Sequence, residues 1–286
     1  MTAAGCRQAL DTLGAMSAPS IAFVGGGNMA AALIGGLIKS GRSPGSILVV
    51  EPFEAQREKL SQAFGIAPLA VADQRLAQAA TVVWAVKPQL FREAAAPCAA
   101  HVGGALQLSV MAGIRSDAIV AATGSERVVR AMPNTPALIG RGIAGLFARE
   151  AVGAAERTEV DSLLAATGTT LWVAREADLD AVTAISGSGP AYVFYFVEAM
   201  MKAAAGMGLT EAQGRELALA TFDGAAALAR QSPLAPSELR AQVTSRGGTT
   251  HAAITSMEAD GVGDAVVRAL HAAARRAKEL GDECGK

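Results

Sequence analysis

The sequence predicts an α/β protein with a doubly wound, mostly parallel sheet in its N-terminal part and an all-α C-terminal part. From Ser20 to about Val173, short apolar runs rich in β-branched residues alternate with alanine-rich helical stretches. Strands that are apolar throughout are typical of parallel sheets with helices on both faces. After Arg175 the β-branched runs stop, and the remaining pattern is typical of helices.

The strand candidates of the first part are Ser20–Val24, Ile47–Val50, Thr81–Val86, Leu106–Val110, Val128–Met132, Ala144–Phe147 and Leu171–Val173. Helical windows lie between them, among them Asn28–Lys39, Glu54–Phe64 and Ala154–Thr167. The later helix candidates are Asp178–Ile185, Ala191–Met207, Glu211–Gln231, Ser237–Val243, Thr250–Ala259 and Gly263–Leu280. We therefore expect a flexible N-terminal extension at residues 1–17, a sheet domain at 18–175 and a helical domain at 176–286.

The composition indicates a globular chain without a polyanionic partner. Its 286 residues are 51% hydrophobic and 18% charged, with a formal net charge of −1, so neither nucleic acid nor an anionic membrane is expected to bind. Cys6, Cys98 and Cys284 lie far apart and show no CxxC spacing. We therefore expect no disulfide framework and no metal site, and a reducing, cytoplasmic compartment fits best.

The most apolar stretch, Ala191–Gly208, contains Glu198 and Lys202 near its middle. Because such charges are costly in lipid, we interpret it as a buried helix and not as a membrane span. It is apolar on nearly every face, more than a small helical domain covers by itself. We therefore expect a second copy of the chain to cover the remainder, with two-fold symmetry. Residues 1–17 have no apolar core and do not read as a secretory signal.

The strongest local motif follows the first predicted strand. Gly25, Gly27 and Ala30 form a G-x-G-x-x-A pattern that leads into a helix. In a dinucleotide-binding fold the first glycine allows a tight turn, the second lets the backbone approach a diphosphate, and the small third residue lets helix and strand pack closely. The diphosphate then lies at the helix N-terminus. The alternative is an ordinary glycine-rich turn.

Glu51 ends the second predicted strand, where such a fold places the acid that binds the adenosine ribose. A carboxylate there favours NADH because it repels a 2′-phosphate. Arg57 follows six residues later and is a candidate to pair with that phosphate. The alternative for both is ordinary surface charge.

Two further turns end strands at the same predicted edge of the sheet. Ala85–Pro88 contains Lys87, which is either catalytic or, as we favour, a positional residue of a turn that contacts the cofactor. Met132–Pro136 is stiffened by two prolines and presents Asn134 and Thr135 as fixed polar groups, or is simply a rigid turn.

In the helical part, Val243–Thr250 reads Val-Thr-Ser-Arg-Gly-Gly-Thr-Thr and precedes a helix. Free N–H groups and hydroxyls at a helix start suit a small carboxylate, although helix capping alone is the alternative. Ser186–Pro190 similarly opens the apolar helix, with Pro190 at a first-turn position. His251 is expected on a helix surface.

Together and in this order, these motifs resemble the Δ1-pyrroline-5-carboxylate reductase family. The matching stretches span about residues 20 to 275 and are Phe23–Ala30, Ala85–Pro88, Arg130–Ala137, Ser186–Tyr192 and Val243–Thr250. The first is generic to nicotinamide enzymes, whereas the last two are specific to the family. The resemblance implies a Rossmann-like domain, a helical dimerisation domain, and NAD(P)H-dependent reduction of 1-pyrroline-5-carboxylate to L-proline.

The resemblance also implies site residues. The cofactor, NADPH or alternatively NADH, is expected on Gly25, Gly26, Gly27, Asn28, Met29, Ala30, Ala85, Val86, Lys87, Pro88, Met111, Ala112 and Gly113. Asn134 of the rigid turn is a further cofactor-binding candidate at the same edge of the sheet. The substrate carboxylate is expected on Ser245, Gly248, Thr249 and Thr250, with Thr250 as the catalytic residue that hydrogen-bonds the ring nitrogen. The family's dimers often assemble into larger rings.

The sequence departs from the family pattern at three places. Arg246 replaces the usual proline of the Thr-Ser-Pro-Gly-Gly loop, Ala72 stands where an asparagine commonly contacts the adenosine ribose, and a glutamate that often precedes the loop is replaced near Pro233.

Two other functions stay open on the residues alone. One is another small imine or 2-oxo-acid reductase of the same architecture, but a hydroxy-acid dehydrogenase needs an acid/base lysine or histidine, and Lys202 lies in the middle of a helix. The other is a redox sensor that binds a nicotinamide cofactor without turnover and needs no Gly-Gly-Thr-Thr pocket.

Overall fold

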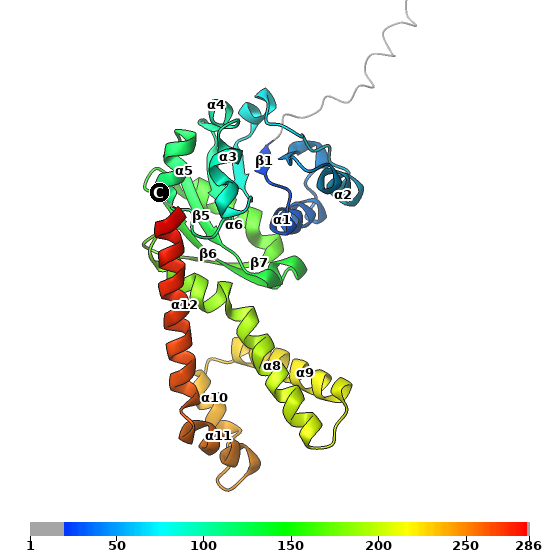
Figure 1. The fold of residues 1–286 in the computed structure, drawn as a ribbon, viewed down its shortest axis with the longest axis vertical. Coiled ribbons are helices and arrows are strands. Elements are labelled where there is room, and N and C mark those ends of the chain that lie inside the picture. The colour runs from blue at the N-terminus through cyan, green and yellow to red at the C-terminus, as the bar shows by residue number, and fades with distance from the viewer. Residues whose placement is uncertain (1–19, 285–286) are drawn as a thin grey trace, which may run out of the picture. The chain divides into compact units, whose positions relative to one another are not determined.

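A computed structural model describes residues 20–284 (Figure 1). By its internal contacts the chain forms two compact units. The first contains residues 20–187 together with 276–284, and the second contains residues 188–275. The extension predicted at residues 1–17 lies outside the described residues.

The first unit is built on a seven-stranded sheet in the order β2-β1-β3-β4-β5-β6-β7. The strands are β1 Ile21–Val24, β2 Ile47–Val50, β3 Thr81–Trp84, β4 Leu106–Ser109, β5 Val128–Met132, β6 Gly142–Ala148 and β7 Gly168–Trp172. Neighbouring strands are parallel except β5 and β6. The predicted α/β class and the mostly parallel sheet are therefore confirmed.

Helices cover both faces of this sheet. The α-helices are α1 Asn28–Lys39, α2 Glu54–Phe64, α3 Phe91–Ala95, α4 Ala99–Val102, α5 Ser116–Thr123, α6 Ala154–Leu164 and α7 Asp178–Val182. The shorter turns are η1 Pro44–Ser46, η2 Gln74–Gln78, η3 Pro88–Leu90, η4 Thr135–Ile139, η5 Ala165–Thr167 and the π-type η6 Thr183–Gly187. One hydrophobic cluster lies beneath α1, α2 and α6 and a second beneath α3, α4 and α5, because alternate residues of each buried strand point to opposite faces.

The last strand differs most from its predicted bounds. It begins at Gly168 and not at Leu171. β7 lies at the edge of the sheet, and its residues alternate between half-buried and exposed. An edge strand with one open face lacks the continuous apolar run that is typical of the central strands.

The second unit consists of helices: α8 Gly189–Gly206, α9 Glu211–Gln231, α10 Pro236–Gln242, α11 Thr249–Ala259 and most of α12 Val262–Cys284. α8 and α9 approach closely at Gly214, where a Cβ would lie 3.0 Å from the Cβ of Ala204. Within residues 20–284 no helix is both long and apolar enough to cross a bilayer.

The predicted division after residue 175 stays a prediction. By contacts, α7 and η6 belong with the sheet, since Gly145 of β6 leaves room for Val182 of α7. The C-terminal end of α12, from Arg276 onward, also belongs to the first unit.

Candidate functional site

The turn between β1 and α1 contains two glycines that differ in their surroundings. Gly25 has φ of +95°, and a Cβ there would lie 2.7 Å from the carbonyl oxygen of Ala85. The fold itself therefore requires glycine at this position. Gly27 is the N-cap of α1, has φ of −68°, and would place a Cβ in open space with no atom within 4 Å. The fold gives no reason for the missing side chain at Gly27, and open space beside a helix N-terminus fits a diphosphate.

Glu51 and Gln56 fix the middle of this turn. Glu51 is only 6% exposed, and its Oε2 accepts a hydrogen bond of 2.8 Å from the N–H of Gly26. Its Oε1 accepts one of 3.0 Å from the N–H of Phe53, and the amide of Gln56 donates to the carbonyl of Gly26 at 2.5 Å. The interpretation of Glu51 as surface charge is therefore wrong. Gln56 was not predicted, since no sequence motif marks it as part of this turn.

The other predicted cofactor residues of the first unit follow β3, β4 and β5. Because these strands and β1 are parallel neighbours, their C-terminal ends meet at one edge of the sheet. Ala85, Val86, Lys87 and Pro88 follow β3, Met111, Ala112 and Gly113 follow β4, and Asn134 follows β5. Ligands of open α/β sheets bind at this edge.

Two polar side chains at this edge, Lys87 and Asn134, differ in their exposure and hydrogen bonds. Lys87 is exposed and forms no ion pair in the described part of the chain. Asn134 donates from Nδ2 to the carbonyl of Ser186 at 3.1 Å and accepts at Oδ1 from the N–H of Ile143 at 3.0 Å. Its amide is thus committed to contacts within the protein, and its contact with a cofactor stays a prediction.

The end of α12 lies beside the turn that follows β4. A Cβ at Gly113 would be 3.5 Å from the carbonyl oxygen of Leu280, and Gly281 leaves room for the guanidinium of Arg115. Arg115 forms a two-pronged ion pair with Asp180 at 3.0 and 3.2 Å. In the sequence this segment continues the pattern of the last helix, and that pattern does not show that the end of the helix packs against the sheet unit.

A buried ion pair lies next to this contact. Arg130 of β5, 5% exposed, donates to Glu176 at 2.8 Å, and Glu176 also accepts from the N–H and hydroxyl of Ser116. Burial by itself raises the pKa of Glu176, but the hydrogen bonds from Ser116 and the charge of Arg130 outweigh it, so the pKa lies below its usual value. Burial lowers the pKa of Arg130 from its usual value, although Glu176 opposes this.

The second unit holds the predicted substrate turn. Gly248 is the N-cap of α11, and no side chain caps this helix start. Within the described residues, the hydroxyls of Ser245, Thr249 and Thr250 make no hydrogen bond to protein. Helix capping therefore does not account for the two threonines. The turn offers hydroxyls and first-turn N–H groups together, as a carboxylate requires.

Two family models match different parts of the chain. A family model for pyrroline-5-carboxylate reductase dimerisation matches residues 176–280, which indicates that the chain assembles as an oligomer. A model described as NADP oxidoreductase, coenzyme F420-dependent, matches residues 20–113.

Two curated relatives of nearly the same length are pyrroline-5-carboxylate reductases. The pyrroline-5-carboxylate reductase of Pseudomonas aeruginosa is 44% identical over 275 residues, which cover 95% of this chain and 100% of the relative. That of Haemophilus influenzae is 41% identical, covering 91% and 97%.

Solved structures agree. The pyrroline-5-carboxylate reductase of Coxiella burnetii superposes with a TM-score of 0.86 at 35% identity, covering 92% of this chain and 98% of that one. The Plasmodium falciparum pyrroline carboxylate reductase, solved with NADP bound, has a TM-score of 0.81 at 25% identity, with coverage of 92% and 98%. This chain belongs to the pyrroline-5-carboxylate reductase family.

Proposed function

We propose that this protein catalyses the NAD(P)H-dependent reduction of 1-pyrroline-5-carboxylate to L-proline, the last step of proline biosynthesis. The observation that carries the proposal is similarity over more than nine tenths of the chain to reductases of this name, at 44% and 41% identity. The open space at Gly27 and the free hydroxyls of the turn before α11 support it independently, since one suits a dinucleotide and the other a small carboxylate.

The glycine turn and the edge of the sheet hold the cofactor. The N–H groups at the start of α1 face the diphosphate, and the absence of a side chain at Gly27 lets the backbone approach it. The turns Ala85–Pro88 and Met111–Gly113 line the same edge. When bound there, the reduced nicotinamide supplies the hydride. NADPH is the proposed cofactor, with NADH as the alternative.

The turn before α11 holds the substrate. Ser245, Gly248 and Thr249 bind its carboxylate, and the hydroxyl of Thr250 hydrogen-bonds the ring nitrogen. A protonated cyclic imine accepts a hydride at its imine carbon directly, so the chemistry needs no strong acid from the protein. The work of these residues is to orient the ring and to exclude water, and positioning supplies most of the rate.

We also propose a cytoplasmic homodimer that assembles into a larger ring. Large apolar side chains on α8 and at its C-terminal end support an extensive interface, since Phe194, Tyr195 and Met207 are 58%, 71% and 75% exposed in the single chain. Two-fold pairing buries such a surface against its own copy.

The reaction is tested by NADPH oxidation with pyrroline-5-carboxylate, pyruvate and glyoxylate as competing substrates. We expect kcat/KM for pyrroline-5-carboxylate to exceed the other two by at least about 100-fold, because the site is built for a ring nitrogen and one carboxylate. Preference for either oxo-acid would show a 2-oxo-acid reductase. Cofactor binding without turnover of any of the three would show a redox sensor.

A further inference from the structure

Two charged residues, Glu51 and Arg57, follow β2. A carboxylate at this place repels the 2′-phosphate of NADPH, whereas a guanidinium attracts it. An acid that binds the adenosine ribose hydroxyls, and so excludes a 2′-phosphate, has to direct a free carboxylate oxygen to the edge of the sheet. Glu51 occupies this position in the sequence but is 6% exposed.

Both oxygens of Glu51 are used inside the protein. Oε2 accepts from the N–H of Gly26, and Oε1 accepts from the N–H of Phe53. The carbonyl of Gly26 is held from the other side by Gln56. Glu51 therefore fixes the peptide of the glycine turn, which both NADH and NADPH contact in the same way, and it directs no charge at the ribose.

Arg57 supplies the charged group at the end of β2 that remains available to a ligand. Its Nη1 donates to the carbonyls of Glu51 and Pro52 at 3.1 and 2.6 Å, which holds the guanidinium at the end of β2. These bonds use one of its three nitrogens, and the others keep their donors.

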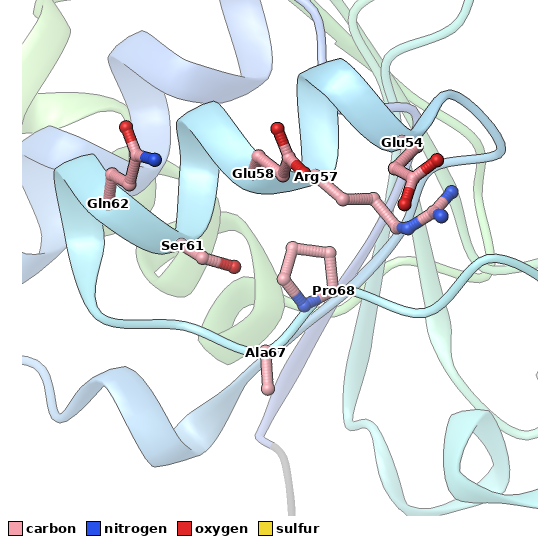
Figure 2. A pocket seen from close by; sticks show the side chains of 7 residues that line it. All are labelled: Glu54, Arg57, Glu58, Ser61, Gln62, Ala67 and Pro68. Carbon is pink, nitrogen blue, oxygen red and sulfur yellow. The ribbon is translucent and has the colours of Figure 1, made fainter.

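The charge of Arg57 is not neutralised. Figure 2 shows its side chain among those that line a pocket beside α2, together with Glu54 and Glu58. Neither carboxylate forms an ion pair with it, and within residues 20–284 Arg57 has no ionic partner. Arg57 is half-buried as a residue. A guanidinium that is anchored by neutral carbonyls and has free donors is suited to a phosphate.

We propose that Arg57 binds the 2′-phosphate of NADPH and sets the preference for NADPH over NADH, while Glu51 acts as a positioning residue for the glycine turn. This inference rests on the proposed function for the identity of the cofactor. It assigns Glu51 the opposite role to the acid of an NADH-specific fold, and the two roles give different results on mutation.

The test measures the ratio of kcat/KM for NADPH to kcat/KM for NADH. Arg57→Gln lowers this ratio by roughly 10- to 100-fold, since a charge-assisted contact to the phosphate is lost. Arg57→Lys retains most of it. The matched control is Lys59→Gln, which removes an exposed positive charge from the same helix and leaves the ratio unchanged. An unchanged ratio in Arg57→Gln, or an equal fall in Lys59→Gln, overturns the assignment.

Glu51→Gln tests the second half of the proposal. An amide cannot accept both backbone hydrogen bonds, so we expect KM for NADPH and for NADH to rise by a similar factor of roughly 3 to 30, with the ratio preserved. A selective loss of NADH affinity, with NADPH unaffected or improved, would show that Glu51 binds the ribose.

Binding of adenosine 2′,5′-bisphosphate and of AMP, measured by calorimetry, separates this inference from the proposed reaction. The wild type binds the bisphosphate at least about 10-fold more tightly than AMP, and Arg57→Gln removes the difference. If this holds while pyrroline-5-carboxylate is not reduced, only the proposed reaction fails. If the two probes bind the wild type equally, the role of Arg57 fails whatever the substrate is.

Discussion

The backbone N–H of Gly248 donates a hydrogen bond of 3.0 Å to the carbonyl of Ser245 and closes a four-residue turn in front of α11. Gly247, inside the turn, has φ of +77°, which favours glycine. A Cβ at Gly248 would lie 2.6 Å from Oγ of Ser245, so a side chain there would displace that hydroxyl. The turn thus holds Ser245 close to the start of the helix that carries Thr249 and Thr250.

Thr250→Ala should lower kcat/KM for pyrroline-5-carboxylate by roughly 10- to 1000-fold, or about 1.4–4 kcal/mol of transition-state binding. NADPH affinity should stay nearly unchanged, because the proposed cofactor residues belong to the first unit. Thr250→Ser keeps the hydroxyl and should recover most of the loss. Steady-state kinetics and NADPH titration measure both. If Thr250→Ala keeps full turnover, the turn only begins α11 and does not bind the substrate.

Arg246→Pro is the control within the same turn. Arg246 lies at the second of its four positions, where proline pre-sets φ and is favoured when the third position has positive φ. The variant should therefore fold and turn over substrate with kcat within about 3-fold of the wild type. A large loss of kcat would show that Arg246 has a catalytic duty that the proposed mechanism lacks.

Gly27→Val and Gly25→Ala should separate cofactor binding from folding. Valine at residue 27 enters open space, so Tm should change little, while NADPH affinity should fall by at least about 10-fold, or about 1.4 kcal/mol. Alanine at residue 25 has to adopt φ of +95° against the carbonyl of Ala85, and should cost about 1–3 kcal/mol of unfolding free energy. Thermal unfolding and NADPH titration of both variants check this. If Gly27→Val and the wild type bind NADPH with equal affinity, the diphosphate does not bind at this turn.

Glu176 should make stability depend on pH in the acid range. Because its pKa in the folded state lies below the usual value, its contribution is complete above the pKa of the unfolded chain and is lost as the pH falls through the folded pKa. At neutral pH, Glu176→Gln should lower the unfolding free energy by about 3 kcal/mol, since Arg130 stays buried without its charge partner.

Urea unfolding from about pH 7 down to about pH 3 measures this dependence. The difference between wild type and Glu176→Gln should shrink toward the acid end. Glu58→Gln, at an exposed carboxylate without an ion pair in the described residues, is the control and should change little. A difference that is constant across the pH range would contradict the role of the Glu176 charge.

The exposed side chains of α8 predict that no stable monomer exists at micromolar concentration. Light scattering of the wild type should give at least twice the mass of one chain. Phe194→Glu places a charge in the proposed interface and should shift the mass toward the monomer, since Phe194 is 58% exposed in the single chain. A wild type that scatters as a monomer would reject the interface.

The sequence predicted most of the fold because local signals mark most element ends. α1, α2 and α9 have their predicted bounds, and the side chain of Thr210 caps α9 at the predicted start. The edge strand β7 and the docking of the end of α12 beside Gly113 were not predictable in the same way. Both depend on which element comes to lie next to which, and no local periodicity encodes that.

For the candidate site, too, the sequence predicted the local motif but not the contacts between distant residues. The G-x-G-x-x-A pattern located the turn, because its glycines follow from local backbone needs. The orientation of Glu51 did not follow, since its partner Gly26 is 25 residues away and the hydrogen bond forms only after β1 and β2 pair. The sequence shows that a carboxylate follows β2, but not whether it points to a ribose or to a backbone N–H.

The stoichiometry of NADPH oxidation and L-proline formation tests the proposed reaction most directly. Purified protein is supplied with NADPH and pyrroline-5-carboxylate, and the NADPH oxidised is compared with the L-proline formed in the same sample. Hydride transfer to the imine carbon predicts about one L-proline for each NADPH consumed, with no oxidation when pyrroline-5-carboxylate is omitted. NADPH oxidation that yields no L-proline, or no oxidation at any concentration of pyrroline-5-carboxylate, would contradict the proposed function.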